Sequence, residues 1–239
     1  MAEIPRAFTG APPRVASLLA PLYIYPNPLT AWNTVAAGAP TIRYVVANPS
    51  SGPGTTVDPN YVAGIAAVRA AGQIVLGYVD TNYGAVPLAT VQANIALWQS
   101  LYGIGTGIFF DRASALSGQL PYYATICEQV HTVPGAYTVL NHGVIPDPGY
   151  AGYADIMVVL ENSYPVNWAA FTPPAWFAQY GAWRFCVLVY TAAGTATMTT
   201  VMTQAASYGI SNVFITDETD GNWTSLPTYL AAEIQLAAS

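Results

Sequence analysis

The chain has 239 residues and a formal net charge of −6, and all six of its cations are arginines. Hydrophobic residues make up 53% of it and charged residues only 8%, which supplies a large core and leaves too little charge for a disordered chain. With no lysine and no basic cluster, the chain lacks the electrostatic footprint of a nucleic-acid-binding protein.

Residues 1–20 are expected to form an N-terminal extension, followed by one domain over 21–239. The start of the chain shows no basic segment followed by an apolar core of about 7 to 15 residues, so no signal peptide is visible. No run approaches the roughly 18 consecutive apolar residues of a membrane span, and we expect no membrane insertion. Cys127 and Cys186 lack metal-type spacing and are expected to be buried free thiols.

From residue 21 onward the chain repeats one theme. A short β-branched or aromatic run ends in polar residues, a Gly/Pro/Asn-rich loop follows, and an alanine-rich segment with helical spacing comes next. Strands are predicted at 21–26, 42–49, 74–80, 107–112, 137–143, 156–163, 185–191 and 213–218. Helices are predicted at 60–72, 88–103, 121–132, 196–209 and 226–239.

Near-continuous apolar strands that alternate with helices predict a parallel sheet covered on both faces, and eight of them predict a closed barrel. The segment 144–155, between the fifth and sixth strands, has room for at most one helical turn. An open nucleotide-binding sheet is the rival, but no G-x-G-x-x-G or G-x-x-x-x-G-K-[ST] motif follows any strand. The predicted fold class is therefore α/β, a single (β/α)8 TIM-type barrel with a short or missing helix between strands 5 and 6.

Catalytic groups of such barrels lie at the C-terminal ends of the strands. Polar side chains follow every predicted strand, and loop caps and turns explain only a few of them in a chain with so little charge. These endings supply Tyr25, Asn27, Asn48, Asp80, Asp111, Arg112, Asn141, His142, Glu161, Asn162, Tyr190, Thr191, Asp217 and Glu218.

Nucleophilic triads and zinc chemistry are poorly supported by these residues. His131 lies in a predicted helix, and His142 stands at the rim with no G-x-S-x-G elbow or reactive cysteine beside it. A zinc site normally needs two or three His or Cys ligands. A magnesium site formed by Asp80, Asp111 and Glu161 stays open as an alternative.

Paired carboxylates fit glycoside hydrolysis, which needs two such groups roughly 5 to 9.5 Å apart. Asp111 and Glu161 end strands 4 and 6, so the barrel would place them on one rim. Both follow apolar runs, where desolvation raises a carboxyl pKa as a general acid requires. Asp80 and Asp217 could tune the pair or bind sugar hydroxyls. Aromatic residues in or near the loops could stack on sugars or simply pack the rim: Tyr23, Tyr25, Tyr83, Tyr164, Tyr190 and Trp223.

The segments "PLYIYPNPLTAW", "VVANPSSGPGTTVDPNYVAGI", "VLGYVDTNYG", "GIFFD" and "VVLEN" resemble the spherulin-4-like family of (β/α)8 glycoside hydrolases. This family includes microbial exopolysaccharide hydrolases that act on galactosamine-containing polymers. The resemblance implies that Asp111 and Glu161 are the catalytic pair and that Asn48, Asp80, Tyr83 and Asn141 line the groove. Together with the strand endings, the predicted substrate-binding residues are Tyr25, Asn48, Asp80, Tyr83, Arg112, Asn141, His142, Tyr190 and Asp217.

One position departs from the family pattern. Family members usually read "FFDE" where this chain reads "FFDR", so Arg112 replaces a second acid. If that acid is essential, the protein is inactive or processes a different sugar. If it only shapes the site, Arg112 could bind an anionic substituent such as a uronate. Neighbouring strand residues point to opposite faces, so Asp111 and Arg112 share the groove only if the strand ends between them.

The predicted function is therefore a glycoside hydrolase acting on a microbial polysaccharide, with a galactosamine-containing polymer as a candidate substrate and with neither cofactor nor metal. The alternative is a catalytically inactive carbohydrate-binding or structural module, for example of a secreted or phage-tail assembly. Either reading predicts an extracellular or virion-associated location, acting on cell-surface or secreted polysaccharide.

Overall fold

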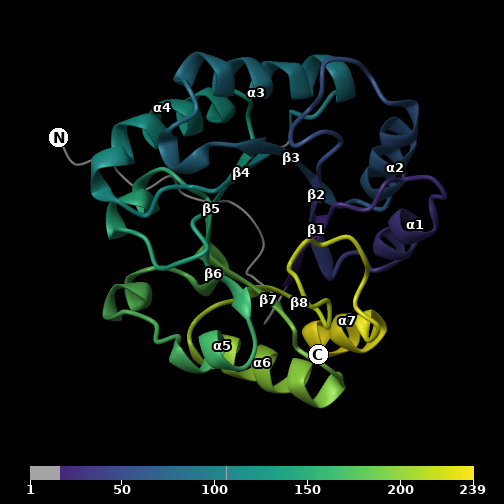
Figure 1. Ribbon diagram of the computed structural model, residues 1–239, viewed down its shortest axis with the longest axis vertical. Coiled ribbons are helices and arrows are strands. Elements are labelled where there is room, and N and C mark those ends of the chain that lie inside the picture. Colours follow the sequence, from purple (N-terminus) through teal and green to yellow (C-terminus); the bar gives the residue numbers. More distant parts are fainter. Residues whose placement is uncertain (1–16, 106) are drawn as a thin grey trace.

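The computed structural model describes residues 17–105 and 107–239. Eight parallel strands form a closed barrel in the order β1 to β8, so that each strand pairs with its neighbours in sequence and β8 closes onto β1. Helices surround the strands on the outside (Figure 1). This arrangement confirms the predicted (β/α)8 barrel.

The strands match the predicted positions closely, with one exception at the start of the chain. They are β1 Ser17–Leu22, β2 Ile42–Ala47, β3 Ile74–Asp80, β4 Gly107–Asp111, β5 Tyr137–Asn141, β6 Ile156–Ser163, β7 Phe185–Tyr190 and β8 Asn212–Ile215. The prediction of a first strand at 21–26 was wrong, because "SLLA" at 17–20 forms the barrel strand and the aromatic residues after Leu22 form the loop that follows. The rest of the predicted extension, residues 1–16, lies outside the described residues.

The helices lie between the strands, and one of the connections has no α-helix. They are α1 Thr30–Ala37, α2 Pro59–Ala70, α3 Leu88–Tyr102, α4 Leu120–His131, α5 Val166–Ala170, α6 Thr195–Ser207 and α7 Leu230–Ala238. Between β5 and β6 there is only a 3-10 turn at Pro148–Gly152, which confirms the predicted short connection. The eight-residue helix α1 was not predicted. Across 17–105 and 107–239, no helix has the length and apolar character to cross a membrane.

Apolar side chains fill both the barrel interior and the layer between strands and helices. Trp98 of α3 shows how closely that outer layer packs, since a Cβ on Gly77 of β3 would lie 2.5 Å from the Trp98 ring. The indole Nε1 of Trp98 also donates a hydrogen bond of 2.8 Å to the carbonyl of Tyr78. Both cysteines are free and buried, as predicted. The helix therefore fixes the strand that carries Tyr78 and Asp80 to the rim.

One buried carboxyl group, that of Glu233, forms a hydrogen bond with the backbone of a barrel strand. Glu233 of α7 is fully buried, and its Oε1 accepts a hydrogen bond of 2.9 Å from the backbone amide of Ile215. That amide is available because β8 pairs with β1 over two residues only. Burial raises the pKa of Glu233 to about 8, against the Ile215 hydrogen bond, which lowers it.

Candidate active site

A cavity of about 440 Å³ opens at the C-terminal ends of the strands. Its walls come from the last residues of β4, β5, β6 and β7 and from the loops after β3, β4, β5 and β8, so it lies at the rim where the sequence predicts the catalytic groups. It brings together seven of the predicted site residues: Tyr83, Asp111, Arg112, Asn141, His142, Glu161 and Tyr190.

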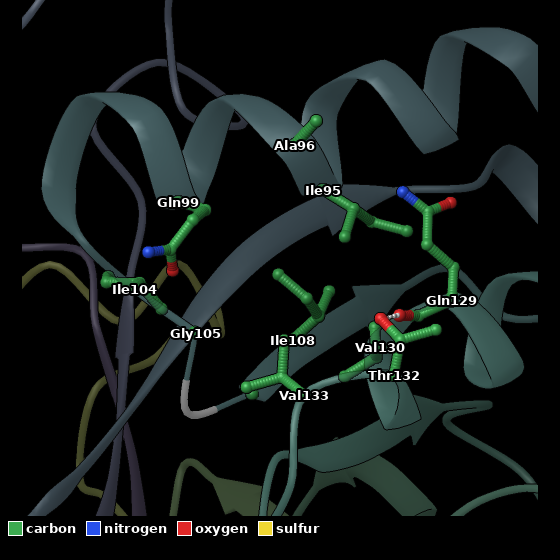
Figure 2. Close-up of a pocket in the computed structure, with 11 residues that line it drawn as sticks. Ile95, Ala96, Gln99, Ile104, Gly105, Ile108, Gln129, Val130, Thr132 and Val133 are labelled. Carbon is green, nitrogen blue, oxygen red and sulfur yellow. Dashed lines mark hydrogen bonds between the residues drawn. The ribbon is translucent and has the colours of Figure 1, made fainter.

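A smaller cavity of about 170 Å³ lies between α3, α4 and the start of β4. Figure 2 shows apolar side chains such as Ile95, Ile108 and Val130 around it, with the amides of Gln99 and Gln129 at its edge. None of its lining residues is acidic or basic. It therefore offers no acid or base for hydrolysis, and the rim cavity is the candidate active site.

Asp111 is the last residue of β4 and turns toward the barrel axis. Its Oδ2 accepts a hydrogen bond of 2.7 Å from the phenol of Tyr78, and its Oδ1 accepts one of 2.7 Å from the side-chain amide of Asn141. Burial raises the pKa of Tyr78, and the Asp111 charge raises it further. The phenol is therefore a permanent donor, and it holds the Asp111 carboxylate in one orientation.

Glu161 lies on β6 and is held from two sides. Its Oε2 accepts a hydrogen bond from the same Asn141 amide, and its Oε1 accepts one of 2.9 Å from the indole Nε1 of Trp223. Burial raises the pKa of Glu161, and the Asp111 charge raises it further, while the two hydrogen bonds lower it. The net effect is a raised pKa, which favours the protonated acid in the cavity.

Asn141 sets the spacing of the two carboxyl groups. One amide nitrogen donates to both, so the facing oxygens of Asp111 and Glu161 lie within about two hydrogen-bond lengths, or roughly 5 Å. Glycosidases that retain the anomeric configuration hold their carboxyl groups about 5 to 5.5 Å apart, and inverting enzymes hold them about 6.5 to 9.5 Å apart. The two carboxyl groups are therefore close enough to act on the same bond.

Arg112 enters the rim because the strand ends before it. Its backbone has the left-handed φ of 47°, and its guanidinium turns to Asp80, with Nε donating a hydrogen bond of 2.8 Å to Oδ1 and Nη2 donating to Oδ2. Partial burial opposes ionisation of Asp80, but the hydrogen bonds from Arg112 and Asn82 outweigh it and lower the pKa of Asp80. Arg112 is thus the partner of Asp80, on the neighbouring strand, and leaves Asp111 free for the cavity.

This pairing also bears on the magnesium alternative. The Asp80 carboxylate is occupied by a guanidinium, and it does not line the cavity with Asp111 and Glu161. Within residues 17–105 and 107–239 there is no group of three or more His, Cys, Asp or Glu side chains placed to hold a metal ion. A three-carboxylate site therefore finds no support.

His142 lines the cavity as a neutral side chain. Its Nδ1 lies 2.8 Å from the carbonyl oxygen of Ser114, which can only accept, so Nδ1 carries the proton. Its ring packs edge-on against Tyr150, with the centroids 4.7 Å apart. Burial lowers the pKa of His142 to about 4, against the backbone hydrogen bonds, which raise it. A histidine of this kind shapes the cavity and carries no charge near neutral pH.

Three predicted substrate-binding residues lie away from the cavity, because their side chains bond within the loops. Tyr25 is half exposed and its phenol bonds to side chains at the start of α2. Asn48 accepts a hydrogen bond of 3.0 Å from the amide of Gly52 and so closes its own turn. Asp217 accepts one of 3.1 Å from the amide of Thr228. These three residues do not line the cavity, and their part in substrate binding stays a prediction.

The sequence did not predict the side chains that contact or surround Asp111 and Glu161 in the cavity. Tyr78 escaped notice inside an apolar strand, although it lies two positions before Asp80 and so shares its face. Tyr23 and Trp223 were considered only as rings that stack on sugars or pack the rim. Tyr23 packs edge-on against Tyr78, with the centroids 5.7 Å apart. Burial raises the pKa of the Tyr23 phenol, and the charges of Asp111 and Glu161 raise it further, which places it beside both carboxylates.

A closed (β/α)8 barrel with a carboxylate pair on the C-terminal rim defines a protein of glycoside-hydrolase-like fold. Residues 17–237 match the model of spherulation-specific family 4, and the chain belongs to this spherulin-4-like family.

Similar proteins agree with this assignment. Spherulin-4 of Physarum polycephalum is 31% identical over 229 residues, which span 90% of this chain and 68% of that protein. The crystal structure of Aspergillus clavatus Sph3 in complex with GalNAc is similar with a TM-score of 0.82 at 25% identity, covering 95% of this chain and 98% of Sph3. A GH113 β-mannanase, AaManA from Alicyclobacillus acidocaldarius, has a TM-score of 0.51 at 9% identity, covering 95% of this chain and 96% of the mannanase; it shares the fold.

Proposed function

We propose that this protein is a glycoside hydrolase that cleaves bonds within a polysaccharide, with Asp111 as nucleophile and Glu161 as general acid. One observation carries the proposal: the Asn141 amide holds both carboxyl groups side by side at the floor of an open cavity. A glycosidase uses two carboxyl groups held close together, one of which has a raised pKa and acts as the acid.

The hydrogen bonds around Glu161 orient its carboxyl group without competing for its proton. Asn141 and Trp223 donate N–H groups to its two oxygens, and neither group can accept a proton in return. A proton on Glu161 is therefore left for an acceptor in the cavity, such as the glycosidic oxygen. Tyr78 and Asn141 occupy both oxygens of Asp111 in the same way and aim that carboxylate.

The reaction then follows two steps. Asp111 attacks the anomeric carbon while Glu161 transfers its proton to the leaving oxygen, and a glycosyl–Asp111 ester forms. Glu161, now ionised, takes a proton from a water molecule, which attacks the same carbon and releases Asp111. Two displacements retain the anomeric configuration. The shared Asn141 donor, which keeps the two carboxyl groups close together, favours this order over a single inverting step, which needs room for water between the carboxyl groups.

We infer a substrate that contains N-acetylgalactosamine, because Sph3 has been crystallised with that sugar and resembles this chain over nearly its whole length. The ring of Tyr83 is 57% exposed at the cavity edge and offers a face on which a sugar can stack. Such polymers lie outside cells, so an extracellular place of work follows; a virion association finds no support among these relatives. The chemistry needs no cofactor.

A second candidate is a carbohydrate-binding module that has kept the fold and lost the reaction. The observation in its favour is Arg112, which stands where the resemblance to the family predicts a second acid. One experiment separates the two. The protein is incubated with N-acetylgalactosamine polysaccharide, and new reducing ends and bound oligosaccharide are both measured. Release of reducing ends supports the hydrolase; binding without release, over neutral, amino-sugar and uronate polymers, supports the module.

A further inference from the structure

The loop between β8 and α7, residues 216–229, carries Trp223 into the candidate active site. The side chain of Trp223 is 3% exposed, and its indole Nε1 donates the hydrogen bond of 2.9 Å to Oε1 of Glu161. Trp223 is the partner of Glu161 that comes from a loop, whereas Asn141 ends a barrel strand. The orientation of Glu161 therefore depends on where this loop lies.

Several contacts fasten the loop in that place. The carbonyl of Trp223 accepts a hydrogen bond of 3.2 Å from the amide of Tyr23, just after β1. Farther along, Oε1 of Glu218 accepts bonds of 2.9 and 2.7 Å from the amide and hydroxyl of Thr224. Trp223 itself has the left-handed φ of 56°, a strained conformation for a bulky residue that persists only where its surroundings hold it.

Aromatic neighbours fix the direction of the indole ring. Trp223 packs edge-on against Phe214 of β8 and Tyr190 of β7, with centroid distances of 6.0 and 6.3 Å. Its N–H can only donate. The bond to Glu161 forms with either protonation state of the carboxyl, and it is stronger to the ionised one, because a charged acceptor strengthens a hydrogen bond.

We propose that Trp223 is a positioning residue for Glu161: its indole N–H fixes the carboxyl in the cavity and sets how readily that carboxyl holds its proton. The catalytic meaning of this contact rests on the function proposed above. The contact itself follows from the hydrogen bond, the buried ring and the loop that carries it.

The other groups near Glu161 decide whether loss of the Trp223 hydrogen bond raises or lowers the pKa of Glu161. The charge of Asp111 on β4, the phenol of Tyr23 and the buried thiol of Cys186 on β7 interact electrostatically with Glu161, and the neutral Asn141 amide bonds to it from β5. None of these is a cation. Removing the Trp223 donor therefore takes away one of the two hydrogen bonds that favour ionised Glu161, so the proton is held to a higher pH.

The test compares Trp223→Phe with Trp168→Phe. Trp168 is an equally buried tryptophan whose indole donates to the neutral amide of Gln204, away from the cavity. Hydrolysis of an N-acetylgalactosamine polysaccharide is followed against pH. We expect the alkaline limb of kcat/KM to move up by about one pH unit in Trp223→Phe and to stay in place in Trp168→Phe. An unmoved limb in Trp223→Phe, or equal shifts in both variants, overturns the proposal.

A second measurement needs neither activity nor a folded Trp223 variant. The indole ¹H–¹⁵N signals of the wild-type protein are followed against pH, and the Trp223 signal is identified as the one that titrates in the wild type and is flat in Glu161→Gln. If no indole signal responds to pH, or if the responding signal still titrates in Glu161→Gln, the Trp223 inference fails. If the signal behaves as expected but no polymer is cleaved, the proposed hydrolase function fails and the contact between Trp223 and Glu161 stands.

Discussion

Glu233 gives the structure its most quantitative prediction, although it lies behind the barrel wall. Its folded-state pKa is about 8, compared with an ordinary value of 4.5, because burial penalises the charge. The folded protein therefore binds more protons than the unfolded chain between these two pH values, and it loses stability as pH rises through that window. The full shift corresponds to about 5 kcal/mol, and about 3.5 kcal/mol of it falls between pH 5 and pH 8.

Glu233→Gln removes the ionisation and keeps an oxygen that can accept the bond from Ile215. The free energy of unfolding is measured in urea at pH 5 and at pH 8 for the wild type and the variant. The replacement has its own packing cost, but that cost does not depend on pH. We expect the variant to gain about 3.5 kcal/mol on the wild type between the two pH values. A difference between the two proteins that is the same at pH 5 and pH 8 would refute the reasoning, and the exposed Glu128→Gln serves as the control.

Arg112→Gln should leave the rate of polysaccharide hydrolysis within about tenfold of the wild type. It should lower the free energy of unfolding in urea by less than about 1 kcal/mol, because the ion pair of Arg112 with Asp80 is partly exposed. Loss of all activity would make Arg112 part of the chemistry. Tyr78→Phe removes one donor to Asp111 and should lower kcat about 10- to 100-fold with little change in KM, measured by steady-state kinetics; an unchanged kcat would contradict that role. Tyr83→Ala should raise KM and spare kcat, since its exposed ring at the cavity edge offers a face for binding; a fall in kcat alone would count against a stacking role.

The strand periodicity predicted most of the barrel, because buried parallel strands carry an apolar signal that short loops interrupt. The same logic predicted Asp111 and Glu161, each of which ends or nearly ends such a run, and placed them on one rim. The first strand was misplaced for a physical reason: the aromatic residues at 23–25 have strong strand propensity, but "SLLA" at 17–20 pairs with β2 and β8. Propensity alone does not say which of two adjacent apolar runs enters the sheet.

The directions in which loop side chains point could not be predicted from the sequence. Trp223 reaches Glu161 from 62 residues away along the chain, and its own left-handed φ, two residues after Gly221, could not be expected for a bulky aromatic residue. Asn48 and Asp217 follow strands as the cavity residues do, yet their side chains bond within their own loops. The pairing of Arg112 with Asp80 was within reach, since β3 and β4 are neighbours and the two residues have opposite charge.

The most direct test of the central claim is the rate of reducing-end release from an N-acetylgalactosamine polysaccharide by the wild type, Asp111→Asn and Glu161→Gln, with Glu128→Gln as the control for a lost surface carboxyl. Thermal unfolding of all four proteins shows that each is folded. We expect a loss of at least about 100-fold in both cavity variants and none in the control. Equal rates in the wild type, Asp111→Asn and Glu161→Gln would contradict it.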